Sequence, residues 1–146
     1  ASEEEMKDAL VKVNLWGFLQ AQQGLDTPIL EKGSNFSGGQ CQRLAIARAL
    51  LHDTPVYIFD EAASNIDAES EEMIMDVIRR LSETKTILLI SHRLANVVES
   101  DRIYMLKDGY VAESGTHEYL MEQNGEYAKL YRSQMELEQY GKEASA

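Results

Sequence analysis

Two neighbouring carboxylates, Asp60 and Glu61, end a short apolar run and could act on water or on a bound cation. The run covers residues 56–59 (VYIF) and is typical of a strand buried on both faces of a parallel sheet. Ligands of such sheets bind at the carboxyl ends of the strands. Successive residues leave a strand in different directions, so one carboxylate could hold a divalent cation through its water shell while the other faces a reacting water. The alternative is that the pair only caps the following turn.

The segment SGGQ, residues 37–40, is a second candidate site. The pattern S-x-x-Q is a capping box that opens a helix, and an apolar stripe continues this helix to Leu51. The two glycines let the backbone come close to a ligand, and the free N–H groups of the first turn favour an anion. The alternative is a helix cap without a ligand.

His92 is the third candidate, because it follows a second apolar run at residues 86–90 (TILLI). It would therefore lie at the same sheet edge as Asp60, where an imidazole can bond to a phosphate oxygen or orient a water. An ordinary loop histidine is the alternative. We expect His52 and His117 to be surface or local structural residues.

These candidate residues need helices and strands to bring them together. The S-x-x-E pattern at residues 2–5 predicts helix over 2–20, interrupted at Gly17, with a second short turn at residues 18–19. A further amphipathic helix is predicted over 69–82. Lys-Asp-Gly at 107–109 predicts a hairpin turn between two short strands. Strands that alternate with helices predict an α/β fold with a parallel sheet, preceded by a helical lobe.

Composition excludes several classes of protein. The chain has 146 residues, with 14 Lys+Arg against 25 Asp+Glu and a formal net charge of −11, so a nucleic-acid partner is not expected. The single cysteine, Cys41, excludes an intrachain disulfide framework and a multi-cysteine metal site. No apolar stretch is long enough for a membrane span, and the acidic start is unlike a signal peptide. We therefore expect an intracellular globular domain.

Together these segments resemble the ATP-binding cassette ATPases, the nucleotide-binding domains of ABC transporters. FSGGQCQRLAIARALL is similar to the signature and its helix, VYIFDEAASNID to the Walker B strand and D-loop, and ILLISHRL to the switch-histidine segment. GLDTPILEKGSNFSGGQ and GYVAESGTHEYL look most like the exporter branch. The resemblance implies a helical signature subdomain over residues 1–52. It also implies the C-terminal part of a RecA-like, parallel-sheet P-loop ATPase core over residues 53–146.

The resemblance also implies roles for the polar residues after the two strands. Asp60 would support Mg²⁺ through water, Glu61 would polarise the attacking water, and His92 would contact the γ-phosphate of ATP. Ser64, Asn65 and Asp67 would form the D-loop, which touches a partner subunit.

In this family ATP is sandwiched between two nucleotide-binding domains. Ser37, Gly38, Gly39 and Gln40 would then meet the γ-phosphate of ATP held by the other protomer. The sequence departs from the family pattern at Phe36, at Cys41 and in ASNI at residues 63–66, and none of these changes a charged catalytic position.

The chain contains no G-x-x-x-x-G-K-[ST] loop for the α- and β-phosphates. We therefore expect it to be the C-terminal part of a longer domain that cannot hydrolyse ATP alone. Apolar surface beside the strand that ends at Asp60 should then be exposed or covered by another copy of the chain. The parent would be an export ATPase whose partners are a second nucleotide-binding domain and a transmembrane domain, on the cytoplasmic face of the cell membrane. One alternative is an inactive binding or regulatory module. A metal-dependent hydrolase using Asp60, Glu61 and His92 is another, although these side chains make a poor closed ligand set.

Overall fold

The structure of the chain is a computed structural model that describes residues 1–144. The chain divides into two compact units, Ala1–Ile90 (the N-terminal unit) and the residues from Ser91 onward (the C-terminal unit). This division by packing falls at a different place from the boundary predicted between residues 52 and 53. That boundary concerns the subdomains of the family resembled, and it stays a prediction.

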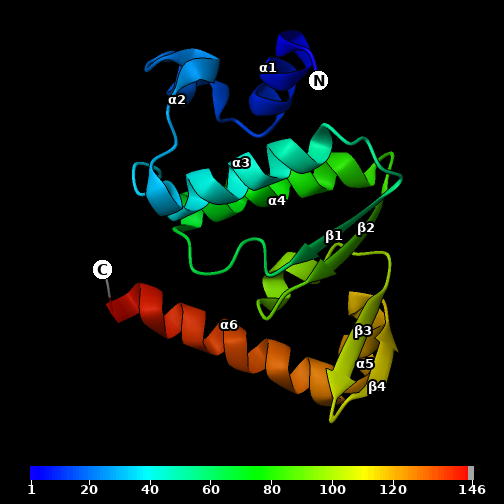
Figure 1. Ribbon diagram of the computed structural model, residues 1–146. Helices are drawn as coiled ribbons and strands as arrows, with labels where there is room; N and C mark the ends of the chain where they lie inside the picture. The colour runs from blue at the N-terminus through cyan, green and yellow to red at the C-terminus, as the bar shows by residue number, and fades with distance from the viewer. Residues whose placement is uncertain (145–146) are drawn as a thin grey trace. The chain divides into compact units, whose positions relative to one another are not determined.

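The N-terminal unit places a layer of helices beside a small parallel sheet (Figure 1). In this unit α3 packs against both α1 and α4, and α4 packs against β2. The elements are α1 (Glu3–Lys12), α2 (Trp16–Gln20), the 3₁₀ turns η1 (Gly24–Asp26) and η2 (Glu31–Gly33), α3 (Gly38–Leu50), β1 (Val56–Asp60), α4 (Ala68–Ser82) and β2 (Thr86–Ile90).

Each of the three longer helices of this unit begins at a polar residue that caps its first turn. Ser2 and Glu5 form a reciprocal capping box at the start of α1. Ser37 and Gln40 form the same arrangement at the start of α3, and the side chain of Asp67 caps α4. The helix starts predicted from S-x-x-E and S-x-x-Q are therefore confirmed.

The two strands of the N-terminal unit pair in parallel, with Asp60 of β1 opposite Ile90 of β2. Tyr57 and Phe59 alternate with Val56 and Ile58, which are 50% and 66% exposed, whereas the two aromatic side chains are buried. The prediction that β1 is buried on both faces was wrong, because the helices cover only one face of this two-stranded sheet. The apolar side chains of Val56 and Ile58 are therefore exposed on the other face of the sheet.

The core of the N-terminal unit lies between its helices and the covered face of the sheet. Val13, Leu15 and Ile74 are completely buried there. Burial of these apolar side chains supplies the main stabilisation of the unit, since the hydrophobic effect scales with the apolar area removed from water.

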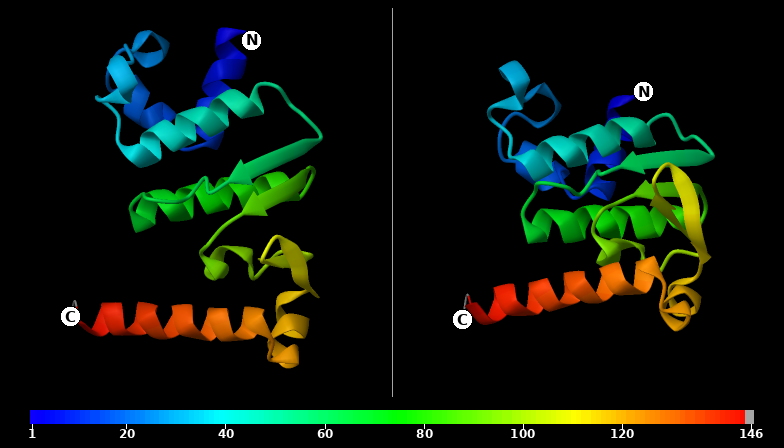
Figure 2. Two further views of the ribbon diagram at one scale, coloured as in Figure 1. Left: turned by 60° about the horizontal axis from the view of Figure 1, so that its bottom comes forward. Right: turned by 90° about the horizontal axis from the view of Figure 1, so that it is seen from below.

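The C-terminal unit contains a hairpin followed by two helices, of which α6 is long and straight (Figure 2). Asp108 and Gly109 between the strands have φ values of 51° and 82°, so the predicted hairpin turn is confirmed. The elements are the 3₁₀ turn η3 (Leu94–Val97), β3 (Ile103–Lys107), β4 (Tyr110–Gly115), α5 (His117–Gln123) and α6 (Glu126–Ala144).

The start of α6 is attached to the hairpin and to α5 by polar contacts. The carboxylate of Glu113 on β4 accepts hydrogen bonds from the first N–H groups of α6, those of Glu126 and Tyr127. The Tyr127 hydroxyl lies 2.9 Å from Nδ1 of His117, and burial raises the pKa of this tyrosine. His117 therefore has the local structural role predicted for it. Over residues 1–144 the helices are all too short or too polar to cross a membrane.

Candidate functional site

The two carboxylates predicted to do chemistry lie at the exposed carboxyl end of β1. Asp60 is the last residue of the strand, and the N–H of Glu61 donates to the C=O of Ile90 at 2.9 Å. Glu61 has a φ of 49°, in the left-handed region that residues other than glycine seldom adopt. The chain therefore turns sharply here, and both side chains are exposed.

The SGGQ segment forms the first turn of α3. The Ser37 hydroxyl accepts from the N–H of Gln40 at 3.2 Å, and Oε1 of Gln40 accepts from the N–H of Ser37 at 2.8 Å. Over residues 1–144, the N–H groups of Gly38 and Gly39 have no hydrogen-bond acceptor. These two donors, together with the positive end of the helix dipole, are suited to an oxyanion.

The two glycines of this turn differ in why they are needed. Gly39 is buried, and a Cβ added to it would overlap Cβ and Oγ of Ser70 in α4. A Cβ added to Gly38 would make only an ordinary contact, 3.6 Å from Ile66. We predicted that both glycines allow a ligand to approach. In the structure, Gly39 also allows α3 and α4 to pack closely, and Gly38 is exposed. The ligand role of both glycines stays a prediction.

The residues between β1 and α4 form a compact turn that ends beside the SGGQ segment. The N–H of Ser64 donates to the C=O of Glu61 at 2.9 Å, and Asn65 has a φ of 56°. Asp67 then accepts from the N–H of Ser70 at 2.9 Å. This backbone hydrogen bond, helped by the Ser70 side chain and by the nearby charge of Arg43, lowers the pKa of Asp67. Asp67 is therefore held as an anion next to the start of α3.

His92 belongs to the C-terminal unit, whereas the other predicted site residues lie in the N-terminal unit. The His92 side chain is exposed, while its backbone C=O accepts a hydrogen bond of 2.6 Å from the Gln134 side chain. The structure thus brings together the predicted residues of the N-terminal unit at two places, the end of β1 and the junction of α3 with α4. His92 lies in the C-terminal unit and is not grouped with either of these two places.

The residues present suit a magnesium ion that is held mainly by water and phosphate. Mg²⁺ prefers oxygen ligands and usually keeps several waters, so one exposed carboxylate at Asp60 fits this kind of site. Across residues 1–144, no cluster of three or more His, Cys, Asp or Glu side chains could bind a metal. A hydrolase whose metal is held by protein ligands alone therefore has no support in this part of the chain.

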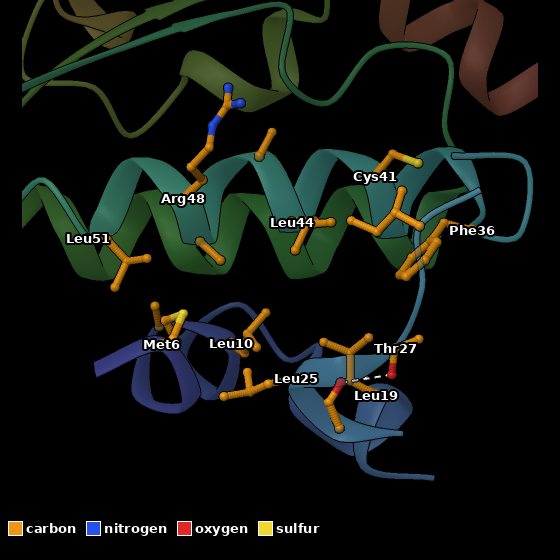
Figure 3. Close-up of a pocket in the computed structure, with 15 residues that line it drawn as sticks. Met6, Leu10, Leu19, Leu25, Thr27, Phe36, Cys41, Leu44, Arg48 and Leu51 are labelled. Atoms are coloured by element: carbon orange, nitrogen blue, oxygen red, sulfur yellow. Dashed lines mark hydrogen bonds between the residues drawn. The ribbon is translucent and has the colours of Figure 1, made fainter. Parts of the chain in front are cut away.

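An apolar cavity of about 490 Å³ lies in the N-terminal unit, between α3 and the segment that contains α1, α2 and η1 (Figure 3). Leu44 and Leu51 point from α3 toward Met6 and Leu10 of α1, whereas Arg48 points away. None of the predicted site residues lines this cavity. Because its lining is almost entirely apolar, it is unsuited to phosphate groups.

Sequence reasoning missed two residues that support the candidate sites. Arg43 is buried beneath the first turn of α3, where Nε donates to the C=O of Gly39 at 3.4 Å and Nη1 donates to the C=O of Asn14 at 2.9 Å. Gln134 of α6 binds the backbone at His92. Asn14 lies 29 residues from Arg43 and His92 lies 42 residues from Gln134, so no local sequence pattern indicates either of these two contacts.

The amino-acid sequence is similar to that of ABC transporter proteins. A family model described as "ABC transporter" matches residues 1–64. An uncharacterized ABC transporter ATP-binding protein of Haemophilus influenzae is 51% identical over 146 residues, which are 100% of this chain and 26% of that protein. An ATP-dependent lipid A-core flippase of Francisella tularensis is 47% identical over 133 residues, which are 90% of this chain and 22% of that protein. The chain thus spans about a quarter of the length of these curated relatives.

A solved structure supports the same similarity. It is the structure of a bacterial Atm1-family ABC exporter with ATP bound, and it matches 92% of this chain and 24% of its own. The TM-score is 0.84 and the sequence identity 36%. The α/β fold with helices and a parallel sheet is therefore shared with an exporter of this class.

Proposed function

Because the chain belongs to the ABC transporter family, as part of an exporter-type nucleotide-binding domain, we propose that it contributes to ATP hydrolysis that drives export. The observation that carries this proposal is the position of Asp60 and Glu61. Both are exposed where β1 ends opposite Ile90, the edge at which parallel sheets bind ligands. The complete domain would be the ATPase.

Glu61 is the proposed general base. Its backbone is fixed by the hydrogen bond to Ile90 and by the turn closed by Ser64, so its exposed carboxylate starts from a defined position. A carboxylate held in this way can accept a proton from water as the water attacks a phosphate. Asp60 would hold Mg²⁺ through bound water, and the ion would neutralise charge on the phosphate oxygens.

The start of α3 is the proposed contact for the γ-phosphate of ATP. The N–H groups of Gly38 and Gly39 would donate to its oxygens, while the capping box keeps Ser37 and Gln40 in place. This chain has no glycine-rich loop and lysine for the α- and β-phosphates. Because ATP is sandwiched between two nucleotide-binding domains in the family that this chain resembles, the ATP that α3 meets would be held by the second domain.

Three further residues take part in this proposed arrangement. His92, whose side chain is exposed, would contact the γ-phosphate. Ser64 and Asp67 would face the second nucleotide-binding domain across the interface. The place of Asp67 beside α3 favours this role, because Asp67 caps α4 next to the buried Gly39.

The complete protein would work at the cytoplasmic face of the cell membrane together with a transmembrane domain. The relatives named as flippases and the Atm1-family structure support this part of the proposal. The isolated chain would bind ATP weakly and would not hydrolyse it, since it has no lysine in a phosphate loop. Calorimetric titration of the chain with Mg-ATP tests this point, and tight binding would contradict it.

The proposed base is tested by Glu61→Gln in the complete nucleotide-binding domain. We expect this variant to bind ATP but to lose hydrolysis, because glutamine keeps the size of the side chain and cannot accept the proton. Glu72→Gln is the matched control, since Glu72 is an exposed glutamate on α4, away from the strand end. Hydrolysis by Glu61→Gln at the wild-type rate would show that another group is the base.

A further inference from the structure

The side-chain amide of Gln134, on α6, binds the backbone on both sides of Arg93. Its Nε2 donates to the C=O of His92 at 2.6 Å, and its Oε1 accepts from the N–H of Leu94 at 2.9 Å. Gln134 lies 42 and 40 residues from these partners in the sequence. We propose that Gln134 is a positioning residue for His92, through which the C-terminal helix holds this histidine in place.

The chemistry of the two contacts suits an amide and no other kind of side chain of this length. A carbonyl needs a donor and an N–H needs an acceptor, and only an amide offers both at its two ends. The N–H of Leu94 belongs to the first residue of η3, where no earlier turn supplies an acceptor. Leu94 is also buried, so Gln134 satisfies a donor that water reaches poorly.

The rest of this segment is tied down by further contacts within the C-terminal unit. The Ser91 hydroxyl accepts from the N–H of Arg93 at 3.0 Å and donates to its C=O at 3.1 Å. The Arg93 guanidinium lies 3.6 Å from the carboxylate of Glu138, one turn after Gln134 on α6. One face of α6 thus supplies two side chains to residues 92–94, and His92 itself is exposed.

The positioning role of Gln134 rests on the proposed contact between His92 and the γ-phosphate. An exposed imidazole acts on a phosphate only when its backbone is held at the correct place, and small displacements of a catalytic group lower the rate strongly. Substrate binding depends mostly on other groups. Loss of the Gln134 contacts should therefore lower kcat for ATP hydrolysis and leave KM nearly unchanged.

The test uses two substitutions of Gln134 in the complete nucleotide-binding domain. Gln134→Met keeps the length of the side chain and removes both hydrogen bonds. Gln134→Glu keeps an acceptor for Leu94 but places a carboxylate oxygen against the C=O of His92. Gln139→Met is the matched control, because Gln139 is an exposed glutamine on the same helix. Each variant is checked for folding by its thermal unfolding midpoint before ATP hydrolysis is measured.

We expect both Gln134 variants to lose about tenfold in kcat, the change that a barrier increase near 1.4 kcal/mol produces. Gln139→Met should match the wild type. In a His92→Ala background, Gln134→Met should have no further effect, since the residue it positions is gone. Amide hydrogen exchange at Leu94 should become faster in Gln134→Met.

The possible contrary results separate this inference from the proposed function. If His92→Ala loses activity while both Gln134 variants keep it, Gln134 does not position His92 and the proposed function stands. If Gln134→Met lowers kcat equally in the wild-type and His92→Ala backgrounds, its role is only structural. If His92→Ala hydrolyses ATP at the wild-type rate, the proposed role of His92 fails, and the positioning role of Gln134 fails with it.

Discussion

Gly39 of α3 and Ser70 of α4 lie so close that any side chain at position 39 would overlap the serine. The same serine donates its backbone N–H to Asp67, which caps α4. One close contact between two helices thus joins the SGGQ turn to the residues that follow Glu61. Gly39, which we propose contacts phosphate, is thus also a packing residue.

We predict that Gly39→Ala destabilises the domain by about 1–3 kcal/mol, the usual range for an overpacked core site. The added methyl group forces α3 away from Ser70, because the atoms it meets are Cβ and Oγ of that serine. Urea unfolding of the complete nucleotide-binding domain measures this loss. Gly38→Ala is the control, since its methyl group would have only an ordinary contact with Ile66.

Restoring the space should restore part of the stability. Adding Ser70→Gly to Gly39→Ala removes the atoms that the new methyl group meets, so the double variant should lose less than the two single changes together. If the effects of the two changes simply add, the overlap with Ser70 is not the cause.

Arg43 supports the SGGQ turn from below, and we expect Arg43→Met to destabilise the domain by about 1–3 kcal/mol. Methionine keeps the apolar stem but leaves the C=O groups of Gly39 and Asn14 without the donors that Arg43 supplies. Arg48→Met is the matched control on the same helix, because Arg48 is exposed. Equal unfolding free energies for the two variants would show that the hydrogen bonds of Arg43 add nothing.

Asp67 should make the stability of the domain depend on pH in the acid range. Its hydrogen bonds with Ser70 lower its pKa in the folded protein below the ordinary value of 3.8, so folding favours the charged form. This contribution is present above the ordinary pKa, and it is lost as the pH falls through the lower pKa of the folded state.

The variant Asp67→Asn isolates this effect, because asparagine still caps a helix but does not titrate. The difference in unfolding free energy between wild type and Asp67→Asn should be constant near neutral pH and should change in favour of the variant below about pH 4. Urea unfolding at a series of pH values measures this difference. Curves that stay parallel down to pH 2 would exclude a lowered pKa at Asp67.

Local sequence patterns were sufficient for the helix starts, the strands and the hairpin. The capping boxes at Ser2 and Ser37, the apolar run before Asp60 and the Asp-Gly turn at 108–109 each involve residues a few positions apart. The backbone preferences of these residues act within one turn or one strand. The local structure that they favour therefore forms without depending on distant parts of the chain. The residue types of the candidate sites could be recognised for the same reason.

Burial and partners could not be predicted in this way. The apolar run at 56–59 suggested a strand covered on both faces, yet Ile58 is 66% exposed, because coverage depends on which elements pack on the sheet. The sequence gives no reason to treat Gly38 and Gly39 differently. They differ in the structure because α4 packs against Gly39 and leaves Gly38 exposed.

The helices, the strands and the chemical groups at their ends follow from short-range backbone preferences and residue type, so the order of residues is enough to predict them. How those groups are held depends on the packing of the folded chain. The hydrogen bonds from Arg43 to the C=O of Asn14 and from Gln134 to the C=O of His92 join residues that packing brings together. A buried donor or acceptor needs a hydrogen-bond partner. Which residue becomes that partner depends on the fold, because residues far apart in the sequence can lie side by side.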